Sequence, residues 1–206
     1  MQTTIDIRPM LKEHLTEVAK VHTVAFKGFF LTLMGESFLR HYYNSVLDYQ
    51  MSIALVAVDS NSRIVGLAVG FKDPTGFYRH FRQYRVRMLP AMAIGLFRRP
   101  WLMLKILRNA GRVSKDGDQD TGRIVELASI CAILSKHHVG TSLLEAFMLR
   151  AQEMGAGEVS LTTDEQDNLA VRAFYERHGF MEQGREERGR RVLVSYSIYF
   201  DKSAPR

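Results

Sequence analysis

The second half of the chain alternates between strand-like and helix-like patterns, and this alternation limits the fold more than any other feature. Runs of apolar residues predict strands, and apolar residues spaced three or four apart predict helices. The expected order is a strand over 124–133, a helix over 139–154, a strand over 159–163, a helix over 168–178 and a strand over 192–200. Gly155 and Gly179 follow the two helices at positions where glycine often ends a helix. Interleaved strands and helices predict a mixed α/β fold.

The first half of the chain is simpler. We expect a short strand at Ile5–Ile7, helices over Leu11–Phe26 and Gly35–Tyr49, and strands at Ile53–Val58 and Ile64–Phe71 joined as a hairpin. At 206 residues the chain is long enough for one substantial core, so we predict a single domain over 1–206. A mostly helical insertion is predicted at about 74–123, broken at Pro90 and Pro100.

Cysteine and histidine usage exclude several classes of site. Cys131 is the single cysteine, so the chain has no internal disulfide and no thiolate metal cluster of its own. The seven histidines show no metal-binding spacing, and we predict no metal site.

The N-terminus has no basic region followed by an apolar stretch. We therefore expect no secretory signal and a cytoplasmic location.

Three segments carry a family resemblance: Glu126–Ile133, Val139–Leu144 (Val-Gly-Thr-Ser-Leu-Leu), and Asn168–Phe180 with its Phe-Tyr-Glu-Arg-His-Gly-Phe end. Together they resemble the GNAT superfamily of N-acetyltransferases. The resemblance is detailed over Glu126–Phe180, looser over Ile5–Phe71, and absent from 74–123. It implies a central, mostly antiparallel sheet with flanking helices, and acyl transfer from acetyl-CoA to an amine.

The start of the helix at 139 is the expected pyrophosphate site. Amides in the first turn of a helix lack intrahelical partners and carry partial positive charge, and glycine lets a phosphate come close. The residues expected to hold acetyl-CoA there are Lys136, His137, His138, Val139, Gly140, Thr141 and Ser142. Two positions depart from the family pattern, since Ser135 stands where Arg or Gln is usual and His138 where the first glycine is usual.

The resemblance also assigns roles to the following helix. Asn168 falls where the family asparagine contacts the pantetheine arm or its neighbourhood, and Tyr175 where a tyrosine acts as general acid toward the CoA sulfur. A phenol with an ordinary pKa near ~10 is protonated at neutral pH and can donate to a departing thiolate. The alternative is that Tyr175 is an ordinary half-buried aromatic residue.

The strand over 124–133 completes the expected site. The resemblance implies that Ile130, Cys131 and Ala132 pair through their backbone with pantetheine, and that Glu126 is the general base. Strand alternation places Glu126 on the same face as Ala128, Ile130 and Ala132. The alternative is that Glu126 is a solvated strand carboxylate. Cys131 has apolar neighbours, which favour an inert, packed thiol over a nucleophile.

The segment 78–115 holds ten Lys or Arg residues and no Asp or Glu, against a net charge of +6 for the whole chain. Its apolar runs argue against nucleic-acid binding. Three roles remain open for it: a roof over the acceptor pocket, a homodimer contact, or a membrane-surface contact. We expect the acceptor to be a primary amine of a small molecule, for which an amino sugar of surface polysaccharide biosynthesis is one candidate. The alternative function is a non-catalytic, CoA-binding regulatory or scaffold module.

Overall fold

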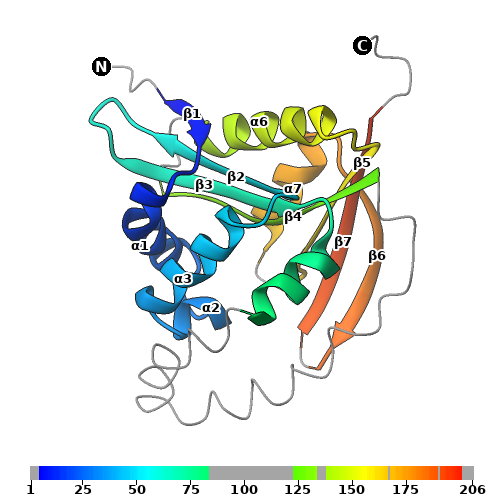
Figure 1. Ribbon diagram of the computed structural model, residues 1–206. Coiled ribbons are helices and arrows are strands. Elements are labelled where there is room, and N and C mark those ends of the chain that lie inside the picture. Colours follow the sequence, from blue (N-terminus) through cyan, green and yellow to red (C-terminus); the bar gives the residue numbers. More distant parts are fainter. Residues whose placement is uncertain (1–4, 84–122, 134–137, 167, 190, 201–206) are drawn as a thin grey trace.

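The computed structural model describes residues 5–83, 123–133, 138–166, 168–189 and 191–200 (Figure 1). These residues form a seven-stranded sheet in the order β1-β2-β3-β4-β5-β7-β6. The strands are β1 (Asp6–Pro9), β2 (Ser52–Val58), β3 (Ile64–Phe71), β4 (Ile124–Ala132), β5 (Glu158–Asp164), β6 (Met181–Arg188) and β7 (Arg191–Tyr199). Neighbouring strands are antiparallel except β4 and β5. The predicted mixed α/β fold with a mostly antiparallel sheet is confirmed.

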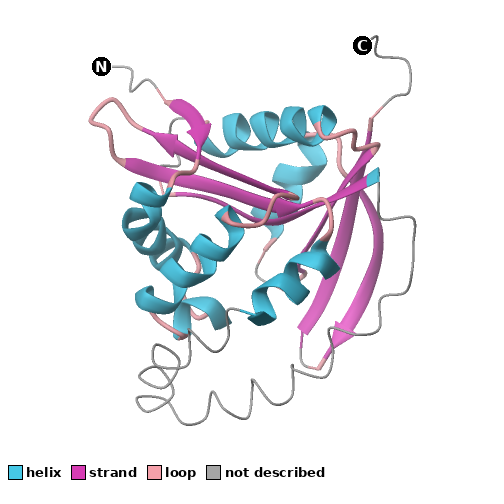
Figure 2. Cartoon of the chain, viewed as in Figure 1, coloured by secondary structure: helices cyan, strands magenta, loops and turns pink. Residues whose placement is uncertain are grey.

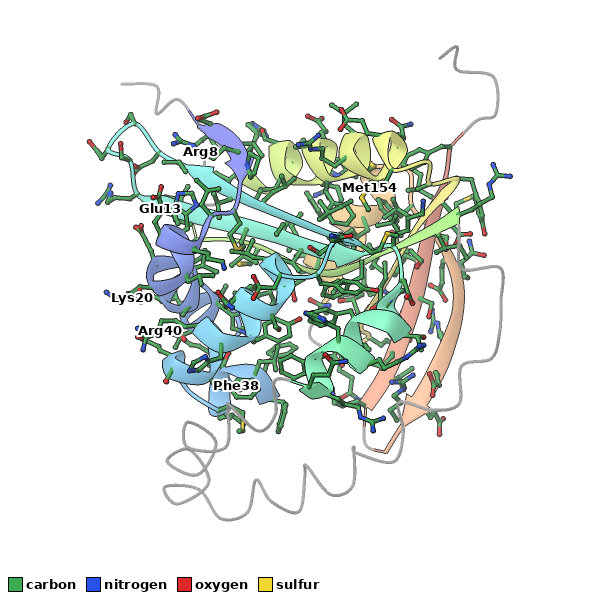
Figure 3. The ribbon with its side chains drawn as sticks, viewed as in Figure 1. Arg8, Glu13, Lys20, Phe38, Arg40 and Met154 are labelled. Atoms are coloured by element: carbon green, nitrogen blue, oxygen red, sulfur yellow. The ribbon has the colours of Figure 1, made fainter. Side chains whose placement is uncertain are left out.

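Helices cover both faces of the sheet (Figures 1 and 2). They are the 3-10 turn η1 (Lys12–His14), α1 (Leu15–Ala25), α2 (Phe30–Leu33), α3 (Glu36–Leu47), α6 (Val139–Glu153) and α7 (Leu169–Arg177), together with helical residues 74–83. Two of the residues labelled in Figure 3 mark the two layers of helices: Phe38 lies on α3 below the sheet, and Met154 lies at the end of α6 above it.

Each face of the sheet has its own apolar core. The first core packs α1, α3 and Phe77 against β2 and β3, and its fully buried members all lie between Met10 and Phe77. The second core packs α6 and α7 against the other face of the sheet, which β2, β3, β5 and β7 help to form. Its members run from Ile53 to Tyr196. Strands β2 and β3 are therefore buried on both sides, which explains their nearly continuous apolar sequence.

Two boundaries in the first half differ from expectation. β1 continues through Arg8 to Pro9, whose Cα lies opposite Leu55, whereas the sequence predicted a strand ending before Arg8-Pro9. Proline is tolerated there because β1 is an edge strand, and one side of an edge strand needs no ladder hydrogen bond. The predicted single helix over Leu11–Phe26 begins as the 3-10 turn η1 and becomes α-helical only at Leu15.

A strand was expected to start at Phe180, after the glycine that ends α7, but the extent of β6 was not predicted from the sequence. All eight of its residues are exposed, so it has none of the apolar alternation that identifies a strand. Its hydrogen bonds come from pairing with β7 from Met181 to Arg188. Pairing with β7 thus forms a strand from a segment whose own sequence does not predict one.

The predicted insertion is described only at its start, where residues 74–83 are helical as expected; the rest of 74–123, up to Gly122, lies outside the described residues. Within the described residues, no helix has the length and apolar character needed to span a membrane. The same residues contain no group of three or more His, Cys, Asp or Glu side chains placed to hold a metal ion.

Candidate active site

The strands β4 and β5 run side by side for only three residues. Their parallel register pairs Ile124 with Glu158, Val125 with Val159 and Glu126 with Ser160. Beyond this point β4 stays paired with β3 on its other edge, and β5 stays paired with β7 to Asp164. From Leu127 to Ala132, the edge of β4 that faces β5 therefore pairs with no strand of the described chain. The two strands open a gap into which an extended ligand could add its own backbone-like hydrogen bonds.

A β-bulge in β4 changes which residues share a face. Val69 lies opposite Ser129 and Gly70 opposite Leu127, so Ala128 is an extra residue. As a result, Ala128 packs against the first core, whereas Ile130 and Ala132 pack against the second. The prediction that Glu126 shares a face with Ile130 and Ala132 is therefore wrong. The bulge reverses the alternation after Ala128, because a shift of one residue moves every later side chain to the other face.

Glu126 lies on the first-core face of the sheet, directly opposite Phe71 of β3. The Phe71 ring stacks on Phe77 at 3.9 Å between centroids, and Phe77 in turn contacts Tyr42 and Tyr78. Burial and the Glu126 carboxylate raise the pKa of Tyr78 to about 12. The partly exposed residue Glu126 therefore lies beside this cluster of aromatic rings, next to the point where β4 and β5 separate.

The start of α6 has the form expected of a phosphate site. His138 has φ 52°, in the left-handed region that favours glycine, and its carbonyl accepts a hydrogen bond from the Ser142 amide at 3.0 Å. Helix geometry leaves the amides of Val139, Gly140 and Thr141 without intrahelical partners. His138 thus occupies a glycine-like conformation at the position where the family has glycine. Lys136 and His137 lie outside the described residues.

Gly140 lies against α7. A Cβ atom at Gly140 would have the Phe174 ring as its nearest neighbour, at 3.7 Å, which is an ordinary contact. Phe174 in turn lies next to Tyr175, with 5.4 Å between ring centroids. The first turn of α6 therefore lies against α7, the helix that carries Tyr175.

Tyr175 is 6% exposed and packs beside Phe180 and Tyr196. Burial raises its pKa to about 12, so its hydroxyl is protonated at neutral pH. Among the described residues, no hydrogen bond engages this hydroxyl. It remains available as a donor.

The side chain of Asn168 forms two hydrogen bonds within the protein. Its Nδ2 donates to Thr163 Oγ1 at 2.6 Å and to the Asp164 backbone carbonyl at 3.1 Å, and the backbone carbonyl of Asn168 accepts from the amide of Arg172. The side chain therefore ties the end of β5 to the start of α7. A contact with pantetheine remains an expectation for Asn168, and its Nδ2 is already used inside the protein.

Cys131 packs against the first core, and burial raises the pKa of its thiol to about 12. A thiol with so high a pKa is not a nucleophile at neutral pH. Packing and the raised pKa of the thiol both favour the interpretation of Cys131 as an inert, packed residue.

A polar strip continues from Glu126 across β5 and β7. Val159 and Leu161 point into the second core, so Ser160, Thr162 and Asp164 lie on the opposite face, with Glu126. On β7 the same alternation places Ser195 and Ser197 on this face. These residues were not predicted as site residues from the sequence. Their signal was present, because hydroxyl or carboxyl groups alternate with apolar residues in both strands.

Comparisons with known proteins agree with this geometry. Residues 119–180 match the sequence model of the acetyltransferase (GNAT) family. A search of curated proteins finds no match.

Three solved structures illustrate the likeness in fold. A GNAT-family acetyltransferase from Streptococcus pneumoniae has a TM-score of 0.59 and 17% identity, covering 96% of this chain and 100% of that one. YncA of Salmonella typhimurium, solved with its cofactor acetyl-CoA, has a TM-score of 0.61 and 12% identity, covering 98% of both chains. PaiA N-acetyltransferase of Thermoplasma acidophilum, in complex with coenzyme A, has a TM-score of 0.56 and 15% identity, covering 93% of this chain and 98% of that one. The resemblance read from the sequence is thus confirmed: the chain has the fold of the GNAT acetyltransferases, and its residues 119–180 carry the sequence pattern of that family.

Proposed function

We propose that this protein is an N-acetyltransferase that transfers an acetyl group from acetyl-CoA to the primary amine of a small molecule. The observation that carries the proposal is the separation of β4 from β5 beyond Glu126 and Ser160. It leaves a strand edge that leads toward the first turn of α6 and opens beside a partly exposed carboxylate. Structures of the same fold have been solved with acetyl-CoA or coenzyme A.

The residues present fit acetyl-CoA. The free edge of β4 at Ile130–Ala132 offers backbone amides and carbonyls to the pantetheine amides. The unpaired amides of Val139, Gly140 and Thr141 suit a pyrophosphate. Protein packing does not require glycine at 140, since a Cβ there would meet no atom closer than 3.7 Å. This favours a ligand, rather than a packing constraint, as the reason for the small residue.

The chemistry requires a base, an oxyanion donor and an acid. Acetyl-CoA supplies the thioester that the amine attacks. In our proposal Glu126 accepts the proton of the amine, directly or through water, and a β4 amide donates to the carbonyl oxygen. The hydroxyl of Tyr175 donates to the departing sulfur. Because its pKa is about 12, Tyr175 acts mainly by hydrogen bonding and releases its proton less readily than an ordinary phenol.

The polar strip supports a hydroxylated acceptor. Ser160, Thr162 and Ser195 present hydroxyl groups on the face that Glu126 shares, and hydroxyl groups both donate and accept hydrogen bonds. An amino sugar offers hydroxyls and a primary amine together, and we propose this class, including amino sugars of surface polysaccharides. The basic segment 78–115 would favour an acceptor that is anionic or lipid-linked. A homodimer or membrane-surface contact through that segment, and a cytoplasmic location, remain part of the proposal.

Calorimetry with acetyl-CoA, followed by thiol detection of CoA release across a panel of amines, tests the proposal. We expect binding, and CoA release that depends on an added amine and falls about 10²- to 10⁴-fold in Glu126→Gln. Binding without release in any amine would instead support the non-catalytic CoA-binding module. That alternative was motivated by the departures at Ser135 and His138. The left-handed conformation of His138 weakens it, because the backbone there keeps the shape that glycine would give.

A further inference from the structure

The polar strip ends in a small hollow that the acetyl-transfer chemistry does not use. It has a volume of about 190 Å³ and is lined by Asp164, Gln166, Arg191 and Val192. Asp164 ends β5 and Arg191 begins β7, so the hollow lies at the end of the strand pair furthest from Glu158 and Tyr199. Three of the four lining side chains carry planar polar groups.

The polar groups of the hollow are held in place. Arg191 Nε donates to Asp164 Oδ1 at 2.7 Å, and the Arg191 terminal nitrogen Nη2 donates to the second oxygen of the same carboxylate. This fork-to-fork pair fixes the planes of both groups. Asp164 neutralises the charge of Arg191, so the hollow combines hydrogen-bond donors and acceptors without a net charge of its own.

An aromatic ring from the other layer reaches the same place. Phe29, in the corner between α1 and α2, has the guanidinium carbon of Arg191 over its ring at 5.6 Å from the centroid. Phe29 is 47% exposed, so a large part of its ring remains accessible. The contact also shows that the polar face of β5 and β7 is the face toward α1 and α2. The alternation of Val159 and Leu161 into the second core independently places the polar face on this side of the sheet.

Distance along β5 relates the hollow to the reaction point. Ser160 lies opposite Glu126 where the strands separate, and Asp164 lies four residues further on. At about 3.3 Å per residue, the separation is about 13 Å. Thr162, between them on the same face, continues the line of hydroxyl groups. A single sugar ring at the reaction point is too short to reach the hollow, whereas two joined rings are long enough.

We infer that Phe29, Asp164, Gln166 and Arg191 form a second acceptor subsite that binds a neutral, hydroxylated ring about one sugar unit beyond the acetylated amine. The carboxylate, amide and guanidinium groups match neighbouring hydroxyls of such a ring, and the apolar C–H face of the ring packs on exposed Phe29. This inference rests on the proposed function, since the reaction point defines where the first ring lies. The acceptor class becomes an amino sugar carried on at least one further sugar unit.

Two amines of matched chemistry provide the test: glucosamine, with one ring, and a β-1,4-linked dimer of glucosamine and glucose, whose second ring is neutral and carries no amine. In the wild-type protein the dimer should have the lower KM. In Arg191→Ala the KM of the dimer should rise about 10-fold, as expected for lost hydrogen bonds to a charged group, while the KM values of glucosamine and acetyl-CoA stay the same. Phe29→Leu should raise the KM of the dimer by a smaller factor. The matched control is Arg150→Ala, which removes an arginine of similar exposure from an arginine–carboxylate pair on α6 (52% for Arg150 and 57% for Arg191).

A binding experiment keeps the inference separate from catalysis. Saturation-transfer NMR with the dimer should show contacts at both rings in wild type, and contacts at the amine-bearing ring alone in Arg191→Ala. If neither amine is acetylated but the pattern of contacts holds, the proposed function fails and the subsite stands. Equal KM changes for the two amines in Arg191→Ala, or contacts that the variant leaves unchanged, would overturn the subsite.

Discussion

Gly140→Ala separates a ligand-binding role for the glycine from a structural one. The new methyl group would have the Phe174 ring as its nearest neighbour, at 3.7 Å, so the folded protein can accommodate it without movement. Alanine is also the better helix former, by up to about 1 kcal/mol. For a chain of this size, that gain corresponds to a rise in Tm of up to about 2–4 °C.

Acetyl-CoA binding should change in the opposite direction. If the pyrophosphate accepts a hydrogen bond from a first-turn amide of α6, the methyl group holds it away and removes about 1.5–3 kcal/mol of charge-assisted bonding. Kd should then rise about 10- to 150-fold. Calorimetry gives Kd, and thermal unfolding gives Tm on the same sample.

The control is Gly184→Ala on β6, where a Cβ atom would meet nothing within 4 Å. We expect it to leave Kd unchanged. A Gly140→Ala protein that is as stable as wild type and binds acetyl-CoA with wild-type affinity would refute the placement of the pyrophosphate at this turn.

Three further predictions follow from single contacts. Tyr175→Phe keeps the packed ring and removes the hydroxyl, so steady-state kinetics should show kcat lowered about 10- to 10⁴-fold with acetyl-CoA affinity unchanged; wild-type turnover would exclude the acid role. Gly70→Ala places a Cβ 2.2 Å from the Glu126 carbonyl oxygen and 2.4 Å from Phe147, so urea unfolding should show a loss of about 1–3 kcal/mol or more, and wild-type stability would contradict this close approach. Burial lowers the pKa of His22 from 6.5 to about 4, so between these pH values His22 is protonated in the unfolded chain and neutral in the folded one. Its stabilising contribution is complete above pH 6.5 and is lost as pH falls toward 4, which between pH 7 and 5 amounts to about 2 kcal/mol that His22→Gln should not lose.

Helices were predicted most accurately where the spacing of apolar residues and a glycine at the helix end indicated the same boundary. The helix α6 was expected over 139–154 and is observed over Val139–Glu153, and the turn after it contains Gly155 with φ 77°. Gly179, expected to end α7 in a left-handed conformation, has φ 86°. Local residue preferences decide such boundaries, so one sequence suffices to find them.

The failures have a different cause. The face of Glu126 relative to Ile130 depends on the bulge at Ala128, and the bulge arises from pairing with β3, more than fifty residues earlier in the chain. The exposed strand β6 exists because β7 supplies its hydrogen bonds. The bulge and the extent of β6 could not be predicted from their own segments, since both depend on pairing with another strand.

The Arg191–Asp164 pair shows a third limit. Alternation in the sequence could have placed Asp164 and Thr162 on the face of Glu126. The contact of Arg191 with Phe29, 162 positions earlier in the chain, follows only from the packing of α1 and α2 over the sheet. Part of the candidate acceptor site was therefore predictable from the sequence, and its far end was not.

The division into two cores has a consequence for synthesis on the ribosome. All the buried members of the first core have been synthesised once the chain has reached Phe77, whereas those of the second core include Phe147 of α6 and Tyr196 of β7. At about 5–20 residues per second, the 70 residues between Phe77 and Phe147 take about 4–14 s to add. Throughout that interval Ile53 and Leu55 lie on a sheet face that has no helix to cover it. The nascent chain should therefore attract chaperones, and a ribosome stalled within this window should hold an intermediate that binds hydrophobic dyes.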